Sequence, residues 1–159
     1  MTEDSLKKIR KHILFVCTGN ICRSPMAEGI FSYLTSHIPE LTCESCGLIA
    51  IDGFPASENA VLAARKYGVD LTGHASKLIT RQHLINADYV FVMTQSHLDI
   101  LMNEFPEFCD KVHLLKEFAQ SDGCLFDKDV ADPIGRDFQT YEKCFLELQD
   151  AIKGVLEKI

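Results

Sequence analysis

A strand, a short loop and a helix start follow one another in the stretch His12–Glu28 (HILFVCTGNICRSPMAE), and this order constrains the fold more than any other part of the chain. The apolar run Ile13–Val16, bounded by polar residues, predicts a short buried strand. Ser24 and Pro25 predict a helix start, because serine can cap a helix and proline is tolerated at its first position. A tight loop between a strand and a helix N-terminus turns backbone N–H groups inward and forms an anion-binding site.

Cys17 and Arg23 stand at the two ends of this loop. The guanidinium of Arg23 offers a planar fork of donors to a tetrahedral oxyanion. A loop that binds an anion also stabilises a thiolate at Cys17 and aims its sulfur at a bound phosphorus. A buried cysteine that only packs as a small hydrophobe would not explain the arginine six residues later at a helix start. The residues therefore indicate a cysteine enzyme that acts on phosphate compounds.

The composition suits a cytoplasmic enzyme. The 159 residues are expected to form one domain (1–159, with a polar leader over 1–11), and 47% hydrophobic and 25% charged residues are typical of soluble globular proteins. A net charge of −7 argues against a nucleic-acid partner. The polar leader is not expected to be a secretory signal, and no apolar run is long enough to predict a membrane span. Seven cysteines, an odd number, favour reduced thiols over a disulfide framework.

Strand-like and helix-like segments alternate along the chain. The expected strands are residues 12–17, 41–49, 89–93 and 112–115; the expected helices are 24–37, 57–67, 80–86, 96–105 and 138–158, with irregular chain over 116–137. This alternation predicts an α/β fold in three layers, with a four-stranded parallel sheet covered by helices on both faces. Ligands bind beyond the carboxyl ends of such strands, so the segments 46–57, 70–77 and 119–137 are expected near the Cys17 loop.

Several motifs resemble those of the low-molecular-weight protein tyrosine phosphatases along most of the chain. They are the loop CTGNICRSPMAE, Ser45-Cys46-Gly47, His74, the strand-like Ala87–Thr94 and the late Asp132-Pro133. The C-x5-R-S pattern alone would also fit other cysteine phosphatases and arsenate reductases. Its position near the N-terminus, together with a late Asp-Pro, is much more specific.

The resemblance implies a two-step mechanism with three catalytic residues. Cys17 attacks phosphorus and forms a phosphocysteine intermediate, while Arg23 and the loop amides hold the oxygens. Asp132 protonates the leaving oxygen and then activates water, so that inorganic phosphate is released. Without the resemblance, Asp127, Asp129 and Asp137 would compete with Asp132 for the role of the acid.

The resemblance also assigns the residues around the nucleophile. Ser24 is expected to hydrogen-bond the thiolate, and Asn20, which tolerates left-handed backbone, to be braced by Ser45 and His74. No metal or cofactor is needed, because Arg23 and the amides do what a cation would do. The expected substrate-binding residues are Thr18, Gly19, Asn20, Ile21, Cys22, Ser24 and Ile134.

The substrate is expected to be a phosphorylated protein. Ile134-Gly135 stands where tyrosine-specific members usually have aromatic residues, and this pattern resembles the bacterial branch that includes protein-arginine phosphatases. Arginine phosphatases carry threonine where this chain has Ile21, which would pack on a phenyl ring and crowd a guanidinium. We therefore expect phosphotyrosine, with phosphoarginine as the alternative. Arsenate reduction is ranked lower because a close late cysteine pair is missing, and a binding module without turnover because Cys17, Arg23 and Asp132 are intact.

The remaining cysteines give two further expectations. Cys22 lies in the same loop as Cys17, and we expect a reversible Cys17–Cys22 disulfide to protect the nucleophile from irreversible oxidation. The alternative is that Cys22 only packs beneath the loop. Cys43 and Cys46 form one C-x2-C without a matching pair, since Cys109 and Cys124 are far apart in sequence, so a zinc site is not expected.

Overall fold

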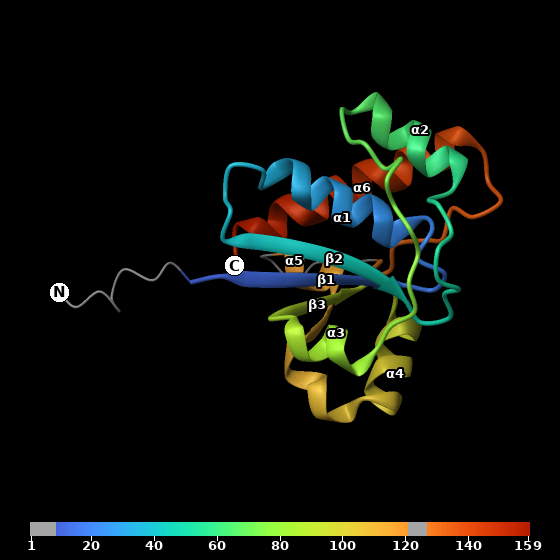
Figure 1. The fold of residues 1–159 in the computed structure, drawn as a ribbon. Helices are drawn as coiled ribbons and strands as arrows, with labels where there is room; N and C mark the ends of the chain where they lie inside the picture. The colour runs from blue at the N-terminus through green and yellow to red at the C-terminus, as the bar shows by residue number, and fades with distance from the viewer. Residues whose placement is uncertain (1–8, 121–126) are drawn as a thin grey trace.

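The structure is a computed structural model that describes residues 9–120 and 127–159. Four parallel strands form one sheet in the order β2-β1-β3-β4, and the predicted α/β architecture is confirmed (Figure 1). The strands are β1 (Lys11–Cys17), β2 (Leu41–Gly47), β3 (Tyr89–Val92) and β4 (Val112–Leu114). None of the helices in the described part of the chain is long and apolar enough to cross a membrane.

Helices cover both faces of the sheet (Figure 1). Helices α1 (Arg23–Leu34), α2 (Glu58–Lys66), α5 (Leu115–Ala119) and α6 (Phe138–Leu156) pack on one face. On the other face lie α3 (Arg81–Asn86), α4 (Gln95–Glu104) and the 3-10 helix η2 (Pro106–Lys111). This is the arrangement expected when parallel strands are joined by helical crossovers.

Strand β1 is buried on both faces, which explains its continuous apolar run. Ile13 and Phe15 belong to the core beneath α1 and α6, whereas Leu14 and Val16 belong to the core above α3 and α4. All four are fully buried. Because side chains alternate along a strand, a run without polar residues is needed where both faces are covered.

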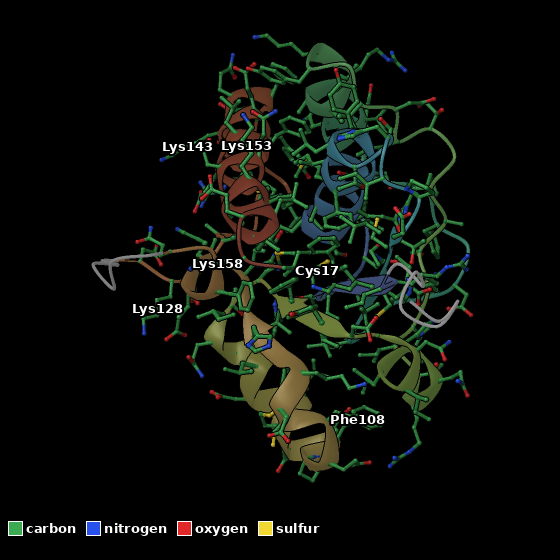
Figure 2. All side chains as sticks on the ribbon, turned by 90° about the vertical axis from the view of Figure 1, so that its left-hand side faces the viewer. Cys17, Phe108, Lys128, Lys143, Lys153 and Lys158 are labelled. Carbon is green, nitrogen blue, oxygen red and sulfur yellow. The ribbon has the colours of Figure 1, made fainter. Side chains whose placement is uncertain are left out.

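Helix α6 presents an apolar stripe to the same core as α1. Tyr141, Phe145, Leu148, Ile152 and Val155 are buried on this stripe. Lys143 and Lys153 lie on the solvent side of the helix, and Figure 2 shows both projecting away from the sheet. The last helix is therefore part of the core.

One expected helix end is wrong, and one helix was not expected. Helix α1 begins at Arg23, with Cys22 in the N-cap position, and it ends at Leu34 rather than at residue 37. Ser24 does not cap it, because its hydroxyl bonds Cys17 and Asn20 instead. The segment predicted as irregular contains helix α5, which begins directly after β4. The other boundaries differ by one or two residues, as is usual at frayed ends.

The sheet order places the Cys17 loop at the point where the chain changes direction. Strands β1 and β3 are neighbours in the sheet. The chain leaves β1 toward β2 and leaves β3 toward β4, so these two connections diverge beyond the carboxyl ends of the strands. Parallel α/β sheets bind ligands in the crevice at such a point. In Figure 1 the segments that follow β1 and β2, and the segment between α2 and α3, meet at this end of the sheet.

Some expectations concern chain outside residues 9–120 and 127–159. Most of the polar leader expected over residues 1–11 lies there, and so does Cys124. Part of the segment 119–137 lies there too, whereas the Asp132 region is described.

Candidate active site

The Cys17 loop (residues 17–23) is held from outside through its carbonyl groups. Leu48 N–H donates to Cys17 O at 3.0 Å, Ile49 N–H to Thr18 O at 2.9 Å, and Ser57 N–H to Ile21 O at 2.8 Å. Among the described residues, no N–H of residues 18–22 has an acceptor. Outward carbonyls leave these N–H groups free to converge on an anion.

Asn20 joins the loop to two neighbouring segments. Its φ of 58° lies in the left-handed region that asparagine tolerates. Its amide donates to Ser24 Oγ at 2.8 Å and to Ser45 Oγ at 3.0 Å, and its Oδ1 accepts from Lys77 N–H at 3.0 Å. His74 Nε2 lies 2.7 Å from Asn20 O. The structure thus brings Ser45 and His74 to Asn20, and each polar atom of this buried side chain is satisfied.

Gly47, at the end of β2, allows the loop to approach the strand. A Cβ at this position would lie 2.6 Å from Thr18 O and 3.0 Å from Asn20 N. No side chain tolerates such contacts with backbone atoms, so the Ser-x-Gly at residues 45–47 has a steric reason. Any larger residue would push the Cys17 loop away from β2.

Cys17 lies at the base of the loop with 3% of its surface exposed, and Figure 2 shows it in the middle of the molecule. Ser24 Oγ lies 2.8 Å from Cys17 Sγ. Because Ser24 Oγ also accepts from the Asn20 amide, its own hydrogen is free to point at the sulfur. A donor in this position stabilises the sulfur as an anion, whether before attack or on departure.

Arg23 is 4% exposed, and its guanidinium is held on three sides. Nη1 donates to Val130 O at 2.9 Å; Nη2 lies 3.4 Å from Thr18 Oγ1 and 3.4 Å from Asp132 Oδ2. Nε is buried without a partner among the described residues. A buried donor normally has an acceptor, so this unpaired N–H fits a site built for an oxyanion.

Asp132 lies on a turn that is much more exposed than the Cys17 loop. Its side chain is 41% exposed, and Oδ1 accepts from Ile134 N–H at 3.1 Å. The turn closes with Arg136 N–H donating to Pro133 O at 2.9 Å, and Gly135 has a φ of 74°. A positive φ at the third residue of such a turn favours glycine. Asp132, and none of its acidic competitors, is placed beside the guanidinium of Arg23.

The side chains from these segments surround a pocket of about 130 Å³. It is lined by Cys17, Thr18, Gly19, Ile21, Cys22, Arg23, Asp132 and Ile134. This volume is below the usual range of pockets that enclose a whole organic ligand. A tetrahedral oxyanion fits in this volume, and a larger attached group must extend out of the pocket, whose apolar lining includes Ile21 and Ile134.

Cys22 lies beneath the loop in a buried polar cluster. Its Sγ is 3.4 Å from Ser57 Oγ and 3.4 Å from Tyr141 OH, and Ser57 Oγ donates to Tyr141 OH at 3.3 Å. Burial raises the pKa of the Cys22 thiol, and the two hydroxyl contacts oppose this only in part. Ser57 occupies the N-cap position of α2 but makes no capping hydrogen bond.

Four residues at the site have no counterpart among the sequence predictions. His97, in the first turn of α4, is 4% exposed and its Nε2 lies 2.9 Å from Thr18 Oγ1. Burial, and then the charge of Arg23, lower the pKa of His97 to about 4. The others are Lys77, Val130 and Tyr141. The sequence could have indicated His97, because it lies just after the expected strand 89–93, at the edge of the sheet where ligands are expected.

Three cysteines outside the Cys17 loop, Cys43, Cys46 and Cys109, do not line the pocket. Cys46 is buried on the sheet face covered by α3 and α4, and Cys109 is exposed in η2. Cys43 Sγ bonds Ser32 at 3.3 Å, and burial raises the pKa of its thiol to about 11. Within residues 9–120 and 127–159, no three His, Cys, Asp or Glu side chains are grouped so that they could hold a metal ion.

Fold and site together define a class of protein. A parallel α/β sheet with a thiol, a guanidinium and free amides in one strand-to-helix loop is the architecture of a cysteine-dependent phosphatase. The chain belongs to the low molecular weight phosphotyrosine protein phosphatase family, whose model matches residues 12–159. Family membership indicates a protein phosphatase that acts on phosphorylated proteins.

Relatives within the family carry two different names. A protein-arginine-phosphatase of Geobacillus stearothermophilus is 35% identical over 147 residues, which is 92% of this chain and 95% of that protein. The low molecular weight protein-tyrosine-phosphatase Wzb of Escherichia coli K12 is 34% identical over 87% of this chain and 88% of its own. The crystal structure of a low molecular weight protein tyrosine phosphatase from T. tengcongensis is similar with a TM-score of 0.85 and 40% identity, covering 94% of this chain and 99% of that one.

Proposed function

We propose that this protein hydrolyses phosphotyrosine in proteins through a phosphocysteine intermediate. In the first step, a sulfur lone pair of Cys17 forms the S–P bond while the P–O bond to the phenol breaks. The carboxylic proton of Asp132 goes to the departing oxygen. Arg23 and the N–H groups of the Cys17 loop hold the three equatorial oxygens and offset their charge.

In the second step, water replaces the thiol. The water oxygen forms a bond to phosphorus, its proton goes to the Asp132 carboxylate, and the S–P electron pair returns to Cys17. Ser24, whose Oγ is 2.8 Å from Cys17 Sγ, stabilises the departing thiolate. The products are inorganic phosphate and the regenerated nucleophile, and no metal takes part in either step.

The apolar mouth of the pocket supports a phenyl ring as the attached group. Ile21 and Ile134 both line the pocket, and Ile134 is 55% exposed. A phenyl ring in contact with these isoleucine side chains buries apolar surface. The relatives' names support either substrate, so the choice of phosphotyrosine depends on these two side chains.

Phosphoarginine is the second candidate, and the Asp132 carboxylate favours it. A guanidinium leaving group is a planar donor that a carboxylate can accept in a bidentate pair. The likeness to the arginine phosphatase of Geobacillus stearothermophilus adds support. Ile21 opposes it, because an isoleucine leaves guanidinium N–H groups without an acceptor and removes their water.

A direct comparison of matched phosphotyrosine and phosphoarginine peptides in chelator tests the proposal. We expect a higher kcat/KM for phosphotyrosine, and we expect Ile21→Thr to move the ratio toward phosphoarginine by about tenfold, as for one buried donor gaining an acceptor. Ile21→Val is the matched control, since it keeps an apolar wall. A parent enzyme that prefers phosphoarginine would overturn the substrate assignment while leaving the phosphatase chemistry intact.

A further inference from the structure

His97 connects helix α4 to the Cys17 loop through a single hydrogen bond. The imidazole follows the N-cap Thr94 by three residues and is almost fully buried. Its Nε2 lies 2.9 Å from Thr18 Oγ1. Its Nδ1 is buried and has no partner among the residues that the structure describes. The ring therefore makes its one side-chain hydrogen bond to a residue that lines the reaction pocket.

The surroundings fix the tautomer of this imidazole. Burial is the main reason that the pKa of His97 is about 4, and the charge of Arg23 adds to it, so the ring is neutral at pH 7. A neutral imidazole has one N–H and one lone pair. Orphaned buried N–H groups are rare because they lose their hydrogen bond to water, so the hydrogen belongs on Nε2, where Thr18 Oγ1 accepts it.

Thr18 Oγ1 then receives two donors. Besides His97 Nε2, the guanidinium Nη2 of Arg23 lies 3.4 Å from the same oxygen. A hydroxyl oxygen has two lone pairs and one hydrogen. With both lone pairs engaged, the hydroxyl hydrogen must point elsewhere, and Thr18 lines the pocket together with Cys17 and Arg23.

We propose that His97 is a positioning residue that makes the Thr18 hydroxyl a hydrogen-bond donor to the oxygens of the bound phosphoryl group. The inference rests on the proposed function, because it adds a side-chain donor to the backbone donors of the same oxyanion site. If the hydrogen were on Nδ1, the Thr18 hydroxyl would instead donate to His97 Nε2 and be lost to the substrate. The tautomer of one histidine thus decides whether Thr18 takes part in the reaction.

The proposal predicts coupling between two residues 79 positions apart in the sequence. Thr18→Val removes the hydroxyl with little change of shape, and His97→Leu removes the donor that orients it. We expect each to lower kcat for an aryl phosphate, and to weaken binding of vanadate, by about tenfold, the usual effect of a charge-assisted hydrogen bond. The double variant should lose no more than either single variant, because both remove the same interaction.

Conservative variants separate positioning from packing. Thr18→Ser keeps the hydroxyl, and His97→Gln can place an amide N–H near the position of Nε2, so both should recover most of the lost vanadate binding. His113→Leu is the matched control, since His113 is a half-buried histidine of β4 whose pKa is also lowered by burial. We expect it to leave kcat and vanadate binding unchanged. Additive losses in the double variant, or no recovery in His97→Gln, would overturn the proposal.

A measurement on the parent protein avoids any problem of folding in the variants. Two-dimensional 15N–1H NMR of the histidine rings distinguishes the tautomers directly. We expect His97 to carry its hydrogen on Nε2 in the free protein and with vanadate bound, and the Nδ1–H tautomer would overturn the proposal. Failure of the proposed function would appear differently, as absent turnover of aryl phosphate by the parent protein. Vanadate binding and the tautomer would still report on Thr18 in that case.

Discussion

The two segments that meet at the pocket are built in opposite ways. The Cys17 loop is buried or half-buried along its length, and its carbonyls and the Asn20 amide are bonded to β2 and the residues just after it, to the chain before α2 and to residues 74–77. The turn that carries Asp132 is exposed, and among the residues that the structure describes the Asp132 carboxylate pairs only with Arg23 and with Ile134 N–H of its own turn. The turn is anchored upstream, where Val130 N–H donates to Met93 O at 2.8 Å and Arg23 donates to Val130 O.

This difference in burial fits the two roles that we propose for these segments, binding of the oxyanion by the Cys17 loop and proton transfer by Asp132. An oxyanion site works because its donors are already in place, so their reorganisation does not add to the barrier. A general acid must reach the leaving oxygen of different substrates and exchange its proton with water, which an exposed turn allows. Variants that remove the nucleophile or an oxyanion donor of the Cys17 loop should therefore lower the rate with every leaving group, whereas the effect of variants of the turn should depend on the leaving group.

The largest effect is expected for Cys17→Ser. Serine is a poorer nucleophile at neutral pH and cannot form the phosphocysteine, so turnover should fall by at least about four orders of magnitude with every substrate. Initial rates with aryl phosphates of different leaving-group pKa measure this. Cys43→Ser, which changes a thiol far from the pocket, is the control and should keep full activity. Turnover by Cys17→Ser at a tenth of the parent rate would exclude this nucleophile.

Asp132→Asn should be next in size. With a poor leaving group such as unsubstituted phenol, kcat/KM should fall by roughly two orders of magnitude, and with p-nitrophenol by much less. The slope of log kcat/KM against leaving-group pKa is the measurement. Asp127→Asn, an exposed neighbour outside the pocket, should keep the parent slope. Equal losses across all leaving groups would show that Asp132 is not the acid.

Asn20 tests whether the bonds around the Cys17 loop matter for rate. Asn20→Ala removes three amide hydrogen bonds and puts alanine at a φ of 58°, so we expect about a tenfold loss of kcat and a loss of roughly 2 kcal/mol in the free energy of unfolding. Urea unfolding and initial rates measure the two effects. Asn20→Gly permits the same φ without the amide, so full activity there would assign the loss to backbone strain alone.

Cys22 tests the expected disulfide with Cys17. After mild peroxide and then reductant, the parent should recover most of its activity, whereas Cys22→Ser should recover only a small part, because its Cys17 oxidises beyond the sulfenic acid. Burial raises the pKa of Cys22, so the resolving step should be faster at higher pH. Equal recovery by parent and variant would mean that Cys22 only packs beneath the loop.

His97 should affect turnover at neutral pH less than the catalytic residues, but it should be visible in acid stability. Its pKa is lowered to about 4 in the folded protein from an ordinary value of 6.5, so only the unfolded chain gains a proton between these values. The free energy of unfolding should therefore fall as the pH falls from about 6.5 to about 4, by up to roughly 3 kcal/mol. Urea unfolding across this range should give a shallower slope for His97→Gln than for the parent. An unchanged slope would contradict a buried neutral imidazole.

The same contrast explains how far the sequence could predict the molecule. The apolar run Ile13–Val16 and the spacing from Cys17 to Arg23 are local signals; they were enough to predict β1 and the helix after it, and they indicate an anion site between the two. The resemblance supplied Asp132, which from its own neighbourhood could not be told from the acidic residues around it. To choose Asp132 as the acid without the resemblance, one must know which carboxylate the fold places beside Arg23.

The residues that sequence reasoning missed have partners far along the chain. His97 bonds Thr18 across 79 positions, Val130 bonds Arg23 across 107, and Tyr141 contacts Cys22 across 119. None has a motif of its own, since a histidine, a valine and a tyrosine are ordinary core residues at such places. The sheet order brings the start of α4, and with it His97, beside the Cys17 loop, whereas Val130 reaches the loop from the chain after α5 and Tyr141 from α6.

The most direct test of the account is to trap the phosphoenzyme. Asp132→Ala, which lacks the base for the second step, is mixed with p-nitrophenyl phosphate, quenched within the first turnover and examined by intact mass and peptide mapping. The account predicts one phosphoryl group per chain, bound to Cys17, with a matching burst of p-nitrophenol. A burst without an adduct on this cysteine, or an adduct on another residue, would contradict it.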